Sequence, residues 1–474
     1  MLLKHLPDNI LPLTKLKRED PFQLQAIIVI MAYIPPHKRH SKDSERPSPV
    51  PELLIVPRKR HLNLKSPSKQ HNYEKSGDVV YGENAIFKWL IVGNLDADDH
   101  NHLEPISVEA FEQRMREKPL VLVNNHPPPK ENEGESTISN TRSESVAVNV
   151  WPDLLSSFEI VRNKMESKEF GKGKPAMVAR FGKILFHGSP SVSSESVLGK
   201  DHVAETTLRR MKRTFYTNTP CSYMENIISG VVPNIGVDLV EEKNIYHIKL
   251  SDKTQPGSAL KCKCGIKEDK KLELHKAKNE DFANVQLKPI RQMVVDVSCI
   301  DKNLDLRLAL YTKRTISALT DEEMHSIRNI VDSAILDPEV KGGLRWPFGK
   351  ACSTSDRYAV IGVWHTIAKK YKSPSLSLMA RHVDRFDFKV AISEATFEVA
   401  LKLRRMVSDL QVNCVCCFHG DLCLLLSWRC KQYVINFSFK FQEEKVETDS
   451  IFDMFKDNLR MIWDHFLCYD QYFP

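Results

Sequence analysis

The stretch NLDLRLALYTKR, residues 303–314, indicates the fold most clearly because a leucine stands at every second position from 304 to 310. Its four leucines fall on one face of an extended chain, whereas Asp305, Arg307 and Tyr311 fall on the other. This period of two predicts a β-strand with one buried face and one polar face. The strand is expected to belong to a sheet that covers an apolar core on one side only.

Working outward, similar patterns predict an antiparallel framework with helices between the strands. TDEEMHSIRNIVDSAI, residues 320–335, opens with Thr320 and Glu323 spaced as a capping box, which predicts a helix. The other predicted strands are 85–94, 119–125, 175–188, 357–368, 385–393, a hairpin over 412–428, and 432–441. The other predicted helices are 107–118, 151–167, 394–410 and a C-terminal helix carrying Phe452, Phe455, Leu459, Ile462 and Phe466 on one side.

Together these segments predict an α+β fold with a mainly antiparallel sheet and interspersed helices. A barrel-like closure of the sheet stays open as an alternative. The α+β body is expected over 81–474, with flexible loops near 127–148 and 188–203. A disordered, basic, Pro-rich tail is expected over 31–80, and residues 1–30 form an extension before it.

The tail also contains the string MAYIPPHKRHSKD, residues 31–43. It resembles the opening of a plant family defined only by a domain of unknown function, number 7903. The resemblance implies that Met31 corresponds to the usual first residue. A looser similarity joins Tyr33, Pro35, Pro36, His37 and Arg39 to strings in disordered ends of RNA-associated proteins, including DEAD-box helicases.

Most of the formal charge of +7 lies in residues 31–78, so the rest of the chain is almost neutral. Charge therefore points to the tail, not to the body, as the part that meets RNA or a protein partner. Arg58, Lys59 and Arg60 form a candidate nuclear-localisation patch in the tail. The cysteines lack the spacing of a disulfide framework, which predicts a reducing compartment, nucleus or cytoplasm. No apolar run is long enough to predict a membrane span.

Two local sequences combine basic and aromatic residues, the pairing that binds single-stranded nucleic acid. LRRMKRTFY contains Arg209, Arg210, Lys212 and Arg213, and GGLRWPFGKA contains Arg345, Trp346 and Lys350. A basic edge strand would also account for the first sequence, and a Trp-Pro turn packed into the core for the second. Both alternatives stay open.

No sequence motif predicts a catalytic residue, a metal site or a cofactor. The cysteines and histidine between Cys414 and Cys430 lack the knuckle spacing of structural zinc, and His382, Asp384 and Asp387 do not share one strand face. The leading hypothesis is a non-enzymatic binding protein, RNA being a candidate ligand. The alternative is a metal-dependent phosphoryl-transfer enzyme or nucleic-acid hydrolase whose site is assembled from distant residues. The oligomeric state is not predicted.

Overall fold

A computed structural model describes residues 80–93, 101–124, 135–166, 174–254, 259–267, 271–274, 285–287, 289–313, 319–347, 357–411 and 434–468. The chain divides into residues 1–47 and residues 48–474, and every described residue belongs to the second unit. The predicted tail, the localisation patch at residues 58–60, Lys350 and the cysteine cluster of residues 414–430 lie outside the described residues.

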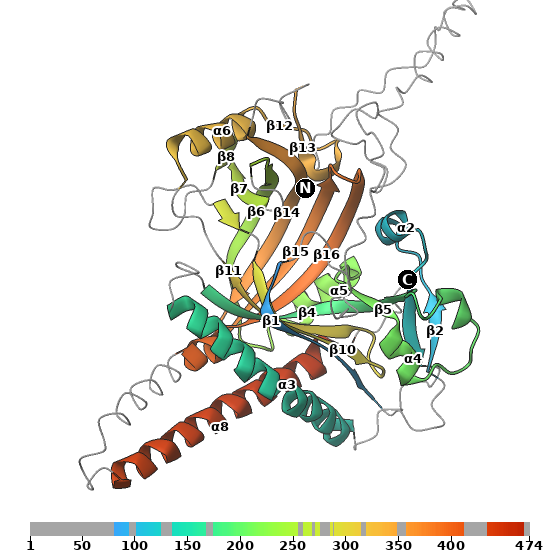
Figure 1. The fold of residues 1–474 in the computed structure, drawn as a ribbon, viewed down its shortest axis with the longest axis vertical. Helices are drawn as coiled ribbons and strands as arrows, with labels where there is room; N and C mark the ends of the chain where they lie inside the picture. The colour runs from blue at the N-terminus through green and yellow to red at the C-terminus, as the bar shows by residue number, and fades with distance from the viewer. Residues whose placement is uncertain are drawn as a thin grey trace, which may run out of the picture. The chain divides into compact units, whose positions relative to one another are not determined.

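The body is built on one 14-stranded mixed sheet in which most pairs are antiparallel (Figure 1). Its main path follows the order β1 (Val80–Val92), β10 (Ile290–Cys299), β11 (Asp305–Lys313), β4 (Lys174–His187), β16 (Ile392–Leu403), β15 (Leu376–Asp387), β14 (Tyr358–Lys372), β6 (Asp238–Asp252), β7 (Ala259–Ile266) and β8 (Leu272–Leu274). Only β1 and β10 pair in parallel along this path. The predicted α+β class with a mainly antiparallel sheet is confirmed.

Shorter strands extend this sheet at its sides. They are β2 (Asn101–Pro105), β3 (Leu120–Asn124), β5 (Lys212–Tyr216) and β9 (Val285–Leu287). Strands β12 (Ile335–Leu336) and β13 (Leu344–Arg345) form a separate pair. Within the described residues, β1 and β8 end the main path and no pairing joins them, so the sheet is not a closed barrel.

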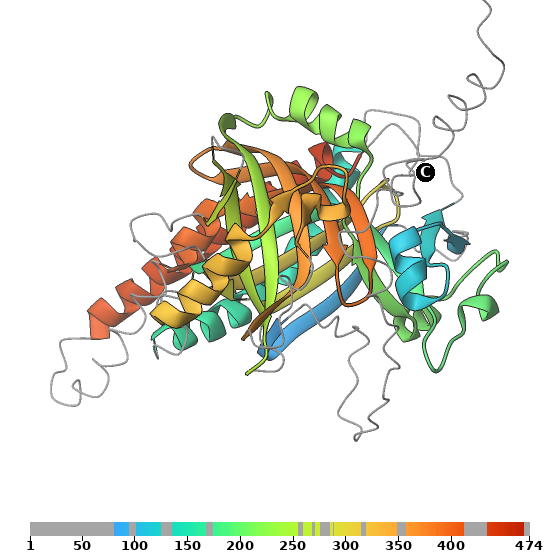
Figure 2. The same ribbon diagram turned by 90° about the horizontal axis from the view of Figure 1, so that it is seen from above.

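Helices α3 (Glu135–Glu166), α6 (Asp321–Asp332) and α8 (Val434–His465) lie on one face of the sheet, whereas the short helix α4 (Glu205–Arg210) packs on the other. The long helices α3 and α8 pack against each other beneath the sheet (Figures 1 and 2), and they cross in the view of Figure 1. Helix α3 contacts β10 and β11, and α6 packs by β8. Short helices α2 (Glu109–Met115), α4 and α5 (Cys221–Asn226) sit between strands, and α5 continues into a π-helical turn, Ile227–Val231. None of the described helices is long and apolar enough to cross a membrane.

The apolar core forms between α3, α8 and the face of the sheet that carries the β11 leucines. Leu306, Leu308 and Leu310 are fully buried there, as the strict alternation predicts. Across the core, the ring of Phe181 stacks on Phe466, with 4.9 Å between centroids. Trp151 of α3 contacts Phe455 of α8 at 5.8 Å. Rings of this size dominate the burial that holds the helix pair on the sheet.

The predicted capping box at the start of α6 is confirmed. Thr320 Oγ1 accepts a hydrogen bond from the Glu323 backbone N–H, and Glu323 accepts one in return from the Thr320 N–H. The apolar side chains Ile327, Ile330 and Val331 of α6 are buried in a second core. This core also contains side chains of β6, β7 and β14. Both cores therefore lie on the same face of the sheet. The opposite face carries the polar side chains described below and a smaller apolar cluster that includes Trp89, Ile184 and Phe215.

Three predicted segments are wrong. Residues 394–403 form strand β16 rather than a helix, because Val399, Leu401 and Leu403 alternate into the core while Thr396, Glu398 and Lys402 face away. Residues 434–441 belong to α8 rather than to a strand, because adding residues to an existing helix costs less than starting a new element. Residues 135–148, expected to be a loop, begin α3, whose Val146, Ala147 and Val150 are buried.

Candidate anion-binding face

The polar face is the face of the sheet opposite α3, α6 and α8, and it carries a cluster of arginines. Strand register places Arg381 of β15 opposite Glu398 of β16, and Arg385 opposite Glu394. Arg180 of β4 lies beside Ala400, one pair away from Glu398 on the same face. Because strand side chains alternate between faces, all these charged groups point away from the apolar cores.

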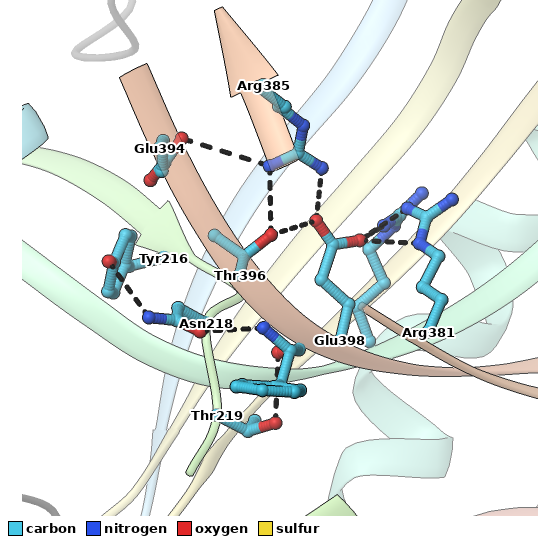
Figure 3. Close-up of polar contacts among 10 residues, drawn as sticks. Tyr216, Asn218, Thr219, Arg381, Arg385, Glu394, Thr396 and Glu398 are labelled. Carbon is cyan, nitrogen blue, oxygen red and sulfur yellow. Dashed lines mark hydrogen bonds and ion pairs between the residues drawn. The ribbon is translucent and has the colours of Figure 1, made fainter. Parts of the chain in front are cut away.

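Glu398 is the centre of this cluster (Figure 3). It is 1% exposed, and Arg381 Nε donates to its Oε2 at 2.8 Å. Arg385 donates to Oε1, and an Arg180 guanidinium nitrogen lies 3.6 Å from Oε2. Thr396 Oγ1 also donates to Oε1 at 3.1 Å. Both carboxylate oxygens are therefore occupied by donors from three strands.

The arginines set the charge state of this cluster. Burial alone would raise the pKa of Glu398, but the charges of Arg381, Arg385 and Arg180 outweigh it and hold that pKa well below its usual range. Burial and the neighbouring charge of Arg381 lower the pKa of Arg180 to about 10. Two carboxylates, Glu398 and the Glu394 that lies 3.8 Å from Arg385, face three guanidinium groups, so the cluster keeps net positive charge. The arginine side chains stay 21–34% exposed, which leaves part of each open to solvent.

Lys261 of β7 joins these arginines because the sheet bends strongly (Figure 2). Burial, and then the charges of Arg381, Lys313, Arg385 and Lys263, lower the pKa of Lys261 to about 7. Lys313 belongs to β11, six strands from β7 along the main path. Strands this far apart in a flat sheet would not interact, since neighbouring strands are about 4.8 Å apart. The bend brings cations from the two ends of the path toward one another.

Further cations and aromatic rings lie on the same face. Trp364 of β14 is the register partner of both Arg385 and His247, and its ring lies 4.7 Å from Lys261 Nζ. Tyr311 lies next to Lys313, whose Nζ is 5.8 Å from the Tyr311 ring centre. The polar face also includes Arg291, Arg307, Lys263 and Lys402.

One of these cations is already neutralised. Arg307 forms two hydrogen bonds with Asp296, at 2.6 and 2.7 Å, and its guanidinium packs on the Phe215 ring at 4.7 Å. Arg307 is thus tied in place, whereas Lys261 makes no contact with any carboxylate among the residues that the structure describes. The face therefore contains both fixed, paired cations and unneutralised ones.

A hydrogen-bonded turn supports the rim of the arginine cluster (Figure 3). Thr219 N–H donates to the Phe397 carbonyl at 2.8 Å, and the Phe397 N–H donates to Asn218 Oδ1 at 2.8 Å. Asn218 also donates to the Tyr216 hydroxyl at 3.3 Å. Burial, followed by the charge of Glu394, raises the pKa of Tyr216 to about 12, so this hydroxyl keeps its proton at neutral pH. The turn fixes β16 where it carries Glu398.

The nearly neutral net charge of the body gave no indication of this positively charged face. Acidic residues elsewhere on the surface, including the exposed Glu109, Glu195 and Asp201, cancel the cations in the sum. The cluster is also invisible to local motifs, because Arg180, Lys261, Arg381 and Glu398 come from four separate strands. One signal was present. If residues 394–403 are taken as a strand, Glu394, Thr396 and Glu398 fall on one face with the spacing of Arg381 and Arg385.

The structure places the residues of LRRMKRTFY at helix α4 and strand β5. Arg213 is buried, donates to the Leu208 carbonyl at 2.8 Å and stacks on Trp89 at 4.5 Å. Arg209 pairs with Glu205 one helical turn away, at 2.7 Å. Arg210 is exposed and Lys212 is half-buried. Arg213 thus has a structural role at the end of α4, while nucleic-acid binding at these positions stays a prediction.

The described residues of GGLRWPFGKA pack on the face of the sheet that α6 covers. Trp346 is buried, and its indole N–H donates to the Ile330 carbonyl at 2.9 Å. Arg345 is exposed and bonds Asp337 at 2.8 Å. Gly342 donates its N–H to Asp384 at 2.9 Å. Contact of this segment with nucleic acid also stays a prediction. Its Trp346 packs in the core beside α6, whereas Leu208 and Phe215 of the other basic stretch pack on the opposite face of the sheet.

Potential metal ligands do not converge in the described parts of the chain, where no group of three or more His, Cys, Asp or Glu side chains could hold an ion. His382 packs on the Phe397 ring, and Asp387 accepts a hydrogen bond from the Lys389 N–H. The described cysteines, Cys221, Cys262, Cys264, Cys299 and Cys468, are free thiols.

Comparison with protein families assigns the chain. The model of the domain of unknown function DUF7903 matches residues 73–417. The protein is a member of the DUF7903 family. All residues of the arginine cluster, and Lys261, fall inside the DUF7903 domain, whereas the whole of α8 lies beyond it. The resemblance found at residues 31–43 is thus confirmed at the level of the family. No curated protein matches the chain in sequence.

The DUF7903 protein resembles two solved structures only distantly. The S. pombe Pct1 RNA triphosphatase in complex with the Spt5 CTD has a TM-score of 0.36 at 6% identity, covering 65% of this chain and 92% of that chain. A structure of S. pombe Pct1 RNA triphosphatase has a TM-score of 0.33 at 8% identity, with the same coverage. Similarity this low carries no conclusion about function.

Proposed function

We propose that this DUF7903 protein is a non-enzymatic binding protein whose polar face binds single-stranded RNA. The observation that supports the proposal is the cluster of Arg180, Arg381 and Arg385 around one buried carboxylate, with Lys261 beside it. Its net positive charge is matched by a phosphate backbone, and guanidinium groups bind phosphate oxygens in pairs.

Aromatic rings among the cations favour a single strand over other polyanions. Trp364 and Tyr311 are half-buried on the polar face, each with a lysine ammonium nearby. Single-stranded nucleic acids bind by placing phosphates on basic groups and bases on aromatic faces. The polar face combines both kinds of group, whereas α4 presents its arginines without an exposed aromatic ring.

The state of Glu398 favours binding over phosphoryl transfer. A general base or metal ligand needs an accessible carboxylate oxygen. Both oxygens of Glu398 accept hydrogen bonds from arginines or from Thr396, and its pKa is held well below the usual range. In this arrangement Glu398 orients the arginines that would meet the ligand.

The experiment measures binding of a fluorescent single-stranded RNA to the full chain by anisotropy at several salt concentrations. Lys313→Gln and Arg385→Gln are compared with Arg209→Gln, which removes the same charge from α4. The first two should weaken binding and each lower the salt slope by about 1, while Arg209→Gln should leave both unchanged. Circular dichroism checks that the variants fold.

Deleting residues 31–78 separates this proposal from the prediction that the tail carries RNA binding. The polar face should retain salt-sensitive binding in the deleted protein. If the deletion abolishes binding, or if only Arg209→Gln weakens it, the polar face is not the RNA-binding surface.

A further inference from the structure

We propose that Lys302 and Cys468 form an oxidative modification site. A hydroperoxide would oxidise the thiol, and the lysine amine would then close a covalent S–N bridge, a sulfenamide. Lys302 lies in the turn between β10 and β11, and Cys468 lies just after the end of α8. Their side chains are in contact, because Lys302 Nζ donates a hydrogen bond to Cys468 Sγ at 2.9 Å. The two atoms that the bridge joins are therefore already neighbours in the folded protein.

The turn that carries Lys302 is held in place on both sides of this residue. The Lys302 backbone N–H donates to the Cys299 carbonyl at 3.0 Å. The neighbouring Asp301 forms an ion pair with Arg142 of α3. These contacts fix the backbone from which the lysine extends, so the amine approaches the sulfur from a defined position.

The segment that carries Cys468 is anchored as well. Phe466 and Leu467 are fully buried in the main core. The Tyr223 hydroxyl donates to the Phe466 carbonyl at 2.8 Å. Cys468 itself is exposed. A small oxidant can thus reach its sulfur, while the backbone on its N-terminal side stays fixed beside the β10–β11 turn.

The chemistry consumes one hydroperoxide. The Cys468 thiolate attacks one peroxide oxygen and the O–O bond breaks, which gives a sulfenic acid and, from hydrogen peroxide, one water. A sulfenic acid condenses with a nearby thiol or nitrogen. Here the neutral Lys302 amine attacks Sγ, the S–O bond breaks, and the hydroxide leaves as water with one amine proton. Thiol, amine and hydrogen peroxide thus give sulfenamide and two waters, with sulfur oxidised and peroxide reduced by two electrons.

The other described cysteines lack this combination of access and a neighbouring amine. Three of them are buried away from solvent: Cys262, Cys264 and Cys299. Cys221 is exposed, but its Sγ lies 3.5 Å from the Glu225 carboxylate, which disfavours the thiolate and cannot trap a sulfenic acid. Among the cysteines that the structure describes, Cys468 is therefore the one suited to the bridge.

The bridge would fasten the end of α8 to the sheet. Lys302 belongs to the DUF7903 domain, whereas α8 lies outside it. A covalent link between positions that are 166 residues apart restricts the unfolded chain over a long loop, and such a link stabilises the folded state. Peroxide would in this way strengthen the attachment of α8. The inference does not depend on RNA binding and stands separately from the proposed function.

The test treats the full chain with hydrogen peroxide, digests it with trypsin and identifies the peptides by mass spectrometry. The wild type should yield residues 292–307 joined to residues 461–474 and uncut after Lys302, because trypsin does not cleave after a modified lysine. Dithiothreitol should separate the two peptides. Lys302→Arg and Cys468→Ser should lack the joined peptides, whereas Cys221→Ser, the matched control at an exposed thiol, should retain them.

A disulfide between Cys468 and another cysteine is the competing product. It would leave the bond after Lys302 open to trypsin and would persist in Lys302→Arg. Finding that disulfide, or a sulfinic acid on Cys468 without joined peptides, would overturn the proposal. Thermal unfolding gives a second readout. Peroxide should raise the midpoint of the wild type but not that of Lys302→Arg, which keeps the charge and lacks the nucleophilic amine.

Discussion

Arg381 and Glu398 are direct cross-strand partners on β15 and β16, and Arg381 Nε donates to Glu398 Oε2 at 2.8 Å. This pair turns the edge of one guanidinium toward a buried carboxylate while Arg385 and Arg180 approach from either side. The four groups form one electrostatic unit. Their behaviour under mutation should therefore differ from that of an isolated surface ion pair.

Glu398→Gln should strongly destabilise the protein. The substitution keeps the side-chain size but leaves three partly buried arginines without their shared counterion, which costs about 3–5 kcal/mol for a buried pair. Urea unfolding at pH 7 measures the change in the free energy of unfolding. Glu394→Gln is the control, since its more exposed carboxylate lies 3.8 Å from Arg385 and should contribute about 0–1 kcal/mol. Equal losses of unfolding free energy in the two variants would contradict the role of Glu398 as the shared counterion of the arginines.

Asp252→Asn should remove a contribution to stability that depends on pH. Hydrogen bonds from Arg357 and Thr254 lower the pKa of Asp252 to about 2, against about 3.9 in an unfolded chain. A carboxylate whose pKa is lower in the folded protein stabilises it at every pH above the pKa of the same group in the unfolded chain. This stabilisation is lost as the pH falls from about 4 to 2. The wild type should exceed the variant in stability at pH 7 and approach it near pH 2. If the difference in unfolding free energy between the wild type and the variant stays constant across this pH range, the pKa of Asp252 is not lowered by folding.

Gly342→Ala should cost more stability than Gly199→Ala. Both glycines adopt positive φ, 77° and 73°, so each alanine carries the backbone strain of about 1–2 kcal/mol. A Cβ at Gly342 would also lie 2.6 Å from Val363 Cγ2, whereas nothing lies within 4 Å at Gly199. Overpacking adds about 1–3 kcal/mol at Gly342 alone. Thermal unfolding of the two variants measures the difference, and equal midpoints would show that the β14 contact is absent.

Trp364→Ala should weaken RNA binding without large loss of stability. Stacking of one base on an aromatic ring contributes about 1–3 kcal/mol, equivalent to roughly 5–150-fold in affinity, and Trp364→Phe should recover part of it. Trp346→Phe gives the opposite pattern, because the buried indole N–H bonds the Ile330 carbonyl. That variant should lose stability and keep its affinity. Anisotropy titrations and urea unfolding distinguish the two tryptophans, and unchanged affinity in Trp364→Ala would remove this ring from the interface.

Local patterns predicted the framework of the fold well. The alternation of β11 identified its buried leucines, and the Thr320–Glu323 spacing identified the start of α6. Such features depend on neighbours within one element, and the sequence therefore carries them. The α3 start at Glu135 and the β16 strand were missed, because tertiary packing overrides weak local preference in polar or alanine-containing segments.

The candidate site could not be predicted from the sequence in the same way. Arg180 and Arg381 are brought together by strand order, with β4 and β15 on either side of β16. The charge of Lys313 influences Lys261, six strands away, only because the sheet bends. Neither relationship leaves a periodic or compositional signal. The basic stretch at residues 208–216 does carry a local sequence signal, but its Arg213 is buried against Trp89.

Photo-crosslinking of a thiouridine-containing single-stranded RNA to the full chain, followed by peptide mass spectrometry, locates the RNA on the protein surface. The polar face predicts crosslinks on β7, β14 and β15, at or beside Lys261, Trp364 and Arg385. Crosslinks confined to residues 31–78 or to α4, with those three strands unlabelled, would contradict it.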